Sequence, residues 1–123
     1  MKNMLLVVAG GAAGTFFRYL VTGADFRLPG WSFPVGTLVV NLTGSLIIGF
    51  LWGFFERFDV SASARMTLFI GVLGGYTTFS AFGLESLNMA REGNLKTALM
   101  YVLATNVFGL AAVFAGFKAS RII

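Results

Sequence analysis

The sequence predicts an all-α membrane protein with four transmembrane helices in a single domain, residues 1–123. The first observation is composition: 57% of the residues are apolar and 11% are charged, whereas a soluble domain carries about 25% charged residues. The second observation is patterning, because the few charges divide the chain into long apolar stretches. A chain with a mean hydropathy of +0.83 lacks the polar residues to cover a water-facing surface, which excludes a soluble enzyme and intrinsic disorder.

The expected spans are residues 3–23, 34–55, 66–88 and 97–118. A helix rises about 1.5 Å per residue, so about 20 mostly apolar residues cross a hydrocarbon core about 30 Å thick. Each stretch reaches or nearly reaches this length. None of them alternates apolar and polar residues, and this favours helices over the strands of a membrane barrel.

Polar connections separate these spans. Residues 25–34 hold both prolines and Trp31, which suits a turn at the membrane interface. Residues 56–63 form a polar loop in which Ser61 or Ser63 is expected to cap the third helix. Residues 91–96 form a short charged turn with a glycine as helix breaker.

The distribution of positive charge gives almost no orientation bias. With four spans, both termini lie on one side of the membrane. That side carries Lys2, Arg57, Arg65, Lys118 and Arg121, and the other side carries Arg18, Arg27, Arg91 and Lys96. The positive-inside rule needs a clear excess on one side. Two interpretations follow: other factors set the topology, or the chain inserts in both orientations, which would permit an antiparallel homodimer.

Glycine placement predicts closely packed helices and an interrupted third span. Gly10 with Gly14, Gly49 with Gly53, and Gly71 with Gly75 stand four residues apart, a spacing that lets helix backbones approach. Residues 74–80 (GGYTTFS) place two glycines and three hydroxyls in mid-span, and these residue types favour an unwound turn. Freed carbonyls at that depth either bind a cation or are compensated by the hydroxyls.

Several polar or aromatic side chains depart from a plain lipid-facing pattern. Phe79 and Phe82 share a helix face, and ring edges could meet an anion without trapping it. The second span contains a lone amide, Asn41. Hydroxyls recur every four residues in the fourth span. The fourth-span residues are Thr97, Tyr101 and Thr105, with Asn106 adjacent. Arg18 and Glu85 are the charges well inside spans, which makes them functional candidates.

Missing residue types narrow the chemistry. The chain has no Cys and no His, which excludes disulfides, thiolate or imidazole metal ligands and Cys/His catalysis. It contains no nucleotide-binding G-x-x-x-x-G-K-[ST] motif and no membrane pair of carboxylates for a proton relay. No nucleophile–base pair is present either. These absences argue against a membrane enzyme and against transport driven by nucleotide hydrolysis or by a proton relay.

Three motifs together resemble the small fluoride channel family, called Fluc or CrcB. They are Gly11-x-x-Gly14-x-x-x-Arg18-Tyr19, then Gly36-Thr37-Leu38-x-x-Asn41, then Gly74-Gly75-x-Thr77-Thr78-Phe79-Ser80-x-Phe82-x-x-Glu85. They occur in order through three of the four expected spans, and the chain length agrees with the family. Two positions depart from the pattern: Tyr76 stands where a smaller aliphatic residue is commoner, and Gly83 where serine is frequent.

The resemblance implies an antiparallel, dual-topology homodimer with two fluoride pores in a prokaryotic inner membrane. It implies an amide donor from Asn41 and ring edges from Phe79 and Phe82 along the pathway. A structural sodium ion at the dimer centre would be held by the backbone carbonyls of Gly74 and Thr77 from both subunits. Further candidates are Thr78, Ser80 and Tyr101 along the pathway and Arg18 near a pore entrance.

Two alternatives remain open at this stage. A structural or assembly subunit with no transport pathway would explain the glycine packing, but it gives no reason for the break at residues 77–80 next to Phe79 and Phe82. Small multidrug-type, proton-coupled exporters also have four spans, similar length and dual topology. Such an exporter needs an acidic residue in its first span to exchange protons against a cationic drug, and here that span contains Arg18 and no Asp or Glu.

Overall fold

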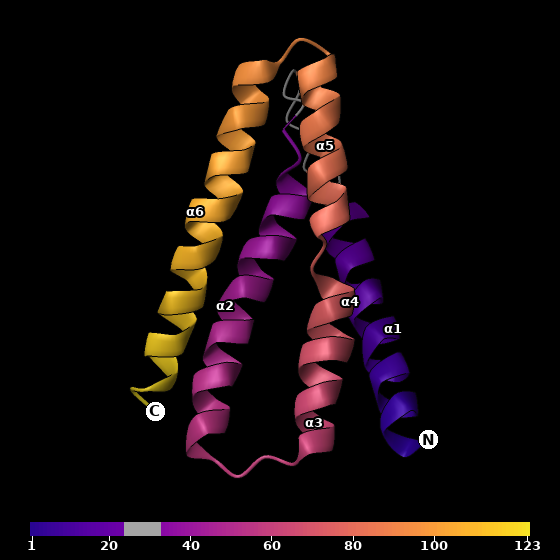
Figure 1. Ribbon diagram of the computed structural model, residues 1–123, viewed down its shortest axis with the longest axis vertical. Coiled ribbons are helices and arrows are strands. Elements are labelled where there is room, and N and C mark those ends of the chain that lie inside the picture. Colours follow the sequence, from indigo (N-terminus) through magenta and orange to yellow (C-terminus); the bar gives the residue numbers. More distant parts are fainter. Residues whose placement is uncertain (24–32) are drawn as a thin grey trace.

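The structure, a computed structural model, describes residues 1–23 and 33–123. Within these ranges, four helical segments are long and apolar enough to cross a membrane. They are α1 (Lys2–Gly23), α2 (Val35–Arg57), the composite third segment Ala62–Arg91, and α6 (Leu95–Ser120). Figure 1 shows both termini and the α2–α3 connection at one end of the bundle, with the α5–α6 turn at the other. The four predicted spans are confirmed, although the third begins at Ala62 and not at residue 66.

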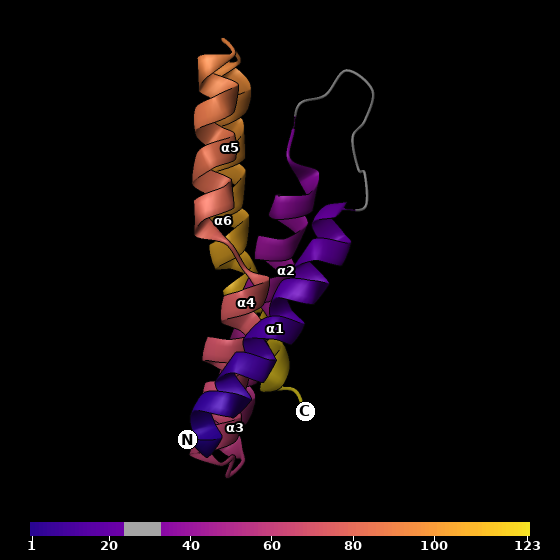
Figure 2. The same cartoon turned by 90° about the vertical axis from the view of Figure 1, so that its right-hand side faces the viewer.

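The third span is built from several pieces. It begins as α3 (Ala62–Met66), continues as a π-helix, η1 (Thr67–Leu73), and then as the single turn α4 (Gly74–Tyr76). Thr77 and Thr78 are extended, with ψ angles of 156° and 115°. The chain then re-enters a helix, α5 (Phe79–Arg91), which lies beside α6 (Figure 2). The predicted break is confirmed but is narrower than the motif, because both glycines stay helical.

The ends of the pieces follow the sequence. Ser61, one of the two expected caps, accepts a hydrogen bond from the Ala64 N–H at 3.3 Å. Thr78 caps α5 in the same way, its hydroxyl accepting from the Ala81 N–H at 3.2 Å. Gly93 has φ +83° and ends α5, as expected for a breaker. Most of the expected turn at residues 25–34, including Trp31, lies outside the described residues.

Glycines bring α1 against η1 and α4. A methyl group at Gly14 would overlap the Val72 carbonyl oxygen, and one at Gly75 would collide with the Gly11 carbonyl oxygen. At Gly75 the missing side chain therefore serves helix packing, and this glycine stays helical. Gly49 and Gly53 do the same on α2, against Val113 and Ser120 of α6 respectively. The predicted packing role of the glycine pairs is confirmed.

The buried core is small and lies where α5 meets α6. Its main cluster consists of Phe82, Met89, Ala98 and Tyr101, and Val40, Phe55 and Leu73 are also buried. Most other large apolar side chains point outward along the helices, which is the arrangement expected where lipid takes the place of water. The chain is an integral, multi-pass membrane protein.

Candidate functional site

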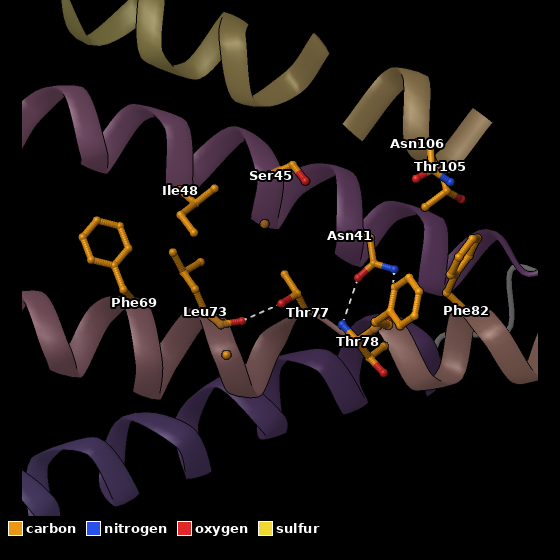
Figure 3. A pocket seen from close by; sticks show the side chains of 13 residues that line it. Asn41, Ser45, Ile48, Phe69, Leu73, Thr77, Thr78, Phe82, Thr105 and Asn106 are labelled. Atoms are coloured by element: carbon orange, nitrogen blue, oxygen red, sulfur yellow. Dashed lines mark hydrogen bonds between the residues drawn. The ribbon is translucent and has the colours of Figure 1, made fainter. Parts of the chain in front are cut away.

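Asn41 of α2 holds the break in the third span. Its Nδ2 donates to the Thr78 carbonyl at 3.0 Å, and its Oδ1 accepts from the Thr78 N–H at 2.9 Å. Figure 3 shows the Asn41 side chain pointing from α2 toward Thr78 of the third span. An extended residue in the membrane has lost both helical partners, and such groups are costly when unpaired. The side chain of Asn41 replaces both partners at once.

The break exposes two backbone carbonyls. In an uninterrupted helix the Thr78 N–H would donate to the Gly74 carbonyl, but here it donates to Asn41. The Thr77 carbonyl accepts from Nη1 of Arg18 at 3.3 Å. Neutral carbonyl oxygens of this kind suit a weakly bound monovalent cation. Acidic, His and Cys side chains form no group of three or more that could hold a metal ion in the described part of the chain.

A groove of about 320 Å³ runs along the inner side of the break, between the third span, α2 and α6. Phe79 and Phe82 stand at one end of it, with ring centroids 5.5 Å apart. The remaining lining combines small, polar and apolar residues: Asn41, Gly44, Ser45, Ile48, Phe69, Leu73, Gly74, Thr77, Thr78, Thr105 and Asn106. The groove therefore offers amide, hydroxyl and aromatic side chains near the middle of the third span (Figure 3).

The two phenylalanines differ in burial. Phe82 is 7% exposed and packs on the ring of Tyr101 at 5.3 Å. Phe79 is 82% exposed, although it lies in the middle of a span next to the break. One ring is thus fixed by the core, and the other projects from the single chain.

A carboxylate is held by two hydroxyls beside this core. Glu85 accepts from Thr37 at 2.7 Å through Oε1 and from Tyr101 at 2.8 Å through Oε2. Tyr101 is fully buried, and Thr37 is 4% exposed. Our sequence reasoning singled out Glu85 and Tyr101 but did not assign Thr37 a role. Its position one helical turn before Asn41 on α2, hence on the same face, was a signal that could have found it.

A second, more polar cavity of about 480 Å³ lies on the other side of Thr78. It is lined by Arg18, Thr22, Thr37, Thr78, Ser80, Ala81, Leu84 and Glu85. The Thr78 and Ser80 hydroxyls are 3.4 Å apart at its edge. Thr78 is therefore shared between the groove and this cavity, and both are open to their surroundings.

The polar residues of α6 have different environments. Thr105 lines the groove, and its hydroxyl is buried and has no hydrogen-bond partner among the described residues. Asn106 also lines the groove, but its amide donates to the Val102 carbonyl of its own helix at 2.7 Å. Thr97 lines neither the groove nor the polar cavity. The structure thus settles the register of α6 that the sequence left open.

Comparison with known proteins assigns the chain to a family. The family described as "CrcB-like protein, Camphor Resistance (CrcB)" matches residues 5–117. The chain belongs to the CrcB family. A relative from Agrobacterium fabrum is 47% identical over 98% of each chain, and one from Rhizobium meliloti is 45% identical over 98% of each. A relative from Parabacteroides distasonis is 44% identical, covering 94% of this chain and 91% of its own. Each of the three is named a fluoride-specific ion channel FluC.

Membership of the CrcB family confirms the resemblance drawn from the three motifs, and it does not favour the small multidrug exporter. The structure brings Asn41, Thr78, Phe79 and Phe82 to one groove in this CrcB-family chain. It places Arg18 and Ser80 in the neighbouring polar cavity instead. Tyr101 lines neither space and lies behind Phe82, where it binds Glu85.

Proposed function

We propose that this chain is a passive, fluoride-selective ion channel that exports fluoride across the bacterial inner membrane and relieves fluoride toxicity. The observation that carries the proposal is the groove beside the clamped break, where an amide, hydroxyls and phenylalanine rings converge in mid-span. The names of the related FluC proteins support the same conclusion. No covalent chemistry is needed, and the chain is not an enzyme.

The pathway would pass through the groove and the polar cavity. Fluoride is small and strongly hydrated, so a narrow pore has to replace its water with hydrogen-bond donors. Asn41 has a second amide hydrogen beyond the one given to Thr78. The hydroxyls of Thr78, Ser80 and Thr105 and the positive ring edges of Phe79 and Phe82 add further contacts. None of these groups carries a charge, so binding stays weak enough for release.

Two residues would act from the sides of this pathway. Arg18 lines the polar cavity and would attract anions to the entrance. Tyr101 would keep Phe82 in place by ring contact while its hydroxyl holds Glu85. The buried Thr105 hydroxyl, which finds no partner among the described residues, is a free donor for a passing anion.

The functional unit would be an antiparallel, dual-topology homodimer with two pores. A single chain leaves Phe79 82% exposed at mid-membrane and leaves the groove open on one side. A second copy would cover both. The nearly even distribution of positive charge between the two ends is compatible with insertion in both orientations.

A structural sodium ion would be held at the dimer centre by the Gly74 and Thr77 carbonyls of both subunits. The Gly74 carbonyl fits this role because the break has removed its helical donor. The Thr77 carbonyl fits because it keeps a second lone pair beyond the one that Arg18 occupies. The positive charge of the sodium ion would offset part of the free-energy cost of moving an anion into a low-dielectric core.

Ion efflux from proteoliposomes tests the proposed function. Vesicles loaded with potassium fluoride or potassium chloride are diluted into ion-free buffer, and valinomycin provides the potassium shunt. We expect rapid fluoride loss with chloride retained, and neither from protein-free vesicles. A folded dimer that releases no fluoride contradicts the proposal, and proton-coupled uptake of a cationic dye would instead support an exporter.

A further inference from the structure

Arg18 occupies one of the two carbonyls exposed by the break. Its Nη1 donates to the Thr77 oxygen at 3.3 Å. The guanidinium reaches this oxygen because α1 packs directly on the third span through Gly14, one helical turn earlier. Arg18 is half-buried, and among the described residues no carboxylate forms a salt bridge with it. The carbonyl is therefore its hydrogen-bonding partner inside the membrane.

This contact has a consequence for the cation site. A guanidinium stays protonated in proteins, so a full positive charge already faces the Thr77 oxygen. A carbonyl has two lone pairs and can accept two partners. Two cations on the same oxygen nevertheless repel each other, and the repulsion is strong where water is scarce.

We propose that Arg18 sets an upper limit on sodium affinity by competing electrostatically for the Thr77 carbonyl. In this role Arg18 is a positioning residue: it orients the carbonyl and keeps cation binding weak. Withdrawal of the side chain is feasible because it also lines the polar cavity of about 480 Å³, which contains the carboxylate of Glu85. The inference rests on the proposed sodium site and adds a residue that opposes binding there.

The test is a sodium titration of thermal stability without fluoride. Melting temperature is measured in detergent as sodium replaces choline at constant ionic strength, for the wild type, Arg18→Gln and Arg18→Met. Both variants remove the charge, and Gln keeps an N–H donor on a shorter side chain. Arg57→Gln is the matched control, because Arg57 also donates to a backbone carbonyl, that of Ser120 at 3.0 Å, at the terminal end of the bundle.

We expect both neutral variants to shift the sodium midpoint to lower concentration by about tenfold, equivalent to about 1.4 kcal/mol. The control should keep the wild-type midpoint. A purely structural role for Arg18 would lower the melting temperature at every sodium concentration and leave the midpoint unchanged, which would overturn the inference. An equal shift in Arg57→Gln would overturn it too.

Failure of the inference is distinguishable from failure of the proposed function. Fluoride efflux is measured on the same wild-type preparation. Fluoride flux and a sodium response with an unchanged midpoint in the Arg18 variants overturn only the role of Arg18. Fluoride flux without any sodium response in the wild type overturns the sodium site and this inference, but leaves the channel. Absence of flux contradicts the channel itself.

Discussion

The side-chain amide of Asn41 forms two hydrogen bonds with the backbone of Thr78, one as donor and one as acceptor, as paired residues of neighbouring β-strands do. Its amide nitrogen donates to the Thr78 carbonyl at 3.0 Å, and its amide oxygen accepts from the Thr78 N–H at 2.9 Å. A helix interrupted in lipid needs such a substitute, because no water is present to satisfy the freed groups. The side chain that contributes a donor to the proposed pathway therefore also holds the break in shape.

Replacement of Asn41 by Ala should lower the free energy of unfolding by about 2 kcal/mol, since a buried N–H and a buried carbonyl both lose their partner. Asn106→Ala is the control: this residue lines the same groove, but its amide bonds within its own helix, and its loss should cost less than about 0.5 kcal/mol. Denaturant or thermal unfolding in mixed micelles measures both. Equal losses would show that Asn41 does not clamp the break.

The hydroxyls that hold Glu85 should be energetically coupled. Tyr101→Phe and Thr37→Val each leave the half-buried carboxylate with one of its two donors, and each should cost about 1 to 2 kcal/mol. The double variant should deviate from additivity by more than about 0.5 kcal/mol, because both hydroxyls bind one group. Unfolding of the four proteins gives the coupling free energy. Strict additivity would indicate that the two hydroxyls stabilise unrelated parts of the bundle.

Two glycines should respond oppositely to alanine. A methyl group at Gly14 would overlap the backbone of Val72, so Gly14→Ala should force α1 away from η1 and cost about 3 kcal/mol. Gly83 of α5 has nothing within 4 Å of the added methyl. Gly83→Ala should therefore stay within about 1 kcal/mol of the wild type, on the stabilising side, because Ala is the better helix former. Melting temperatures of the purified variants test the contrast.

The span count, the break and the glycine packing could be predicted because each has a strong local cause. Charge-free length decides the spans, and Gly, Thr and Ser clustered in mid-span decide the break. The extent of the break could not be predicted from the same residues. Both glycines remain helical, and Gly75 packs directly against Gly11 of α1. A contact between residues so far apart in the sequence leaves no trace in local propensity.

The site was predictable in its residue types but not in its connections. Asn41, Phe79 and Phe82 lie together as expected. Asn41 forms two hydrogen bonds with the backbone of Thr78, and Arg18 donates to the Thr77 carbonyl. Both sets of contacts depend on how α1 and α2 cross the third span. The environments of the recurring hydroxyls of α6 depend on helix packing in the same way. The rotation of α6 about its axis decides that Thr105 lines the groove while Thr97 does not.

Removal of the unpartnered Thr105 hydroxyl should affect fluoride efflux and not stability, which distinguishes a role in the pathway from a role in folding. Thr105→Val keeps the shape of the side chain and removes a buried hydroxyl that has no partner among the described residues. Stability should therefore be unchanged or rise by up to about 1 kcal/mol, while fluoride efflux falls by about tenfold. Thr67→Val, which removes a hydroxyl bonded to the Ser63 carbonyl in its own helix, should leave efflux unchanged. Wild-type efflux from Thr105→Val would remove this hydroxyl from the pathway.

The exposed ring of Phe79 should matter for conduction and not for folding of the single chain. Phe79 is 82% exposed and contacts Phe82, so its removal opens no cavity in the core. Phe79→Ile keeps an apolar side chain but loses the positive ring edge that an anion would meet. Efflux of fluoride from proteoliposomes should fall by at least about tenfold, with the elution volume in size-exclusion chromatography unchanged from the wild type. Phe114→Ile, which changes a ring 70% exposed on α6, should conduct like the wild type. If both variants lose flux equally, the loss reflects a general need for aromatic bulk, and the ring edges of Phe79 have no special part in the pathway.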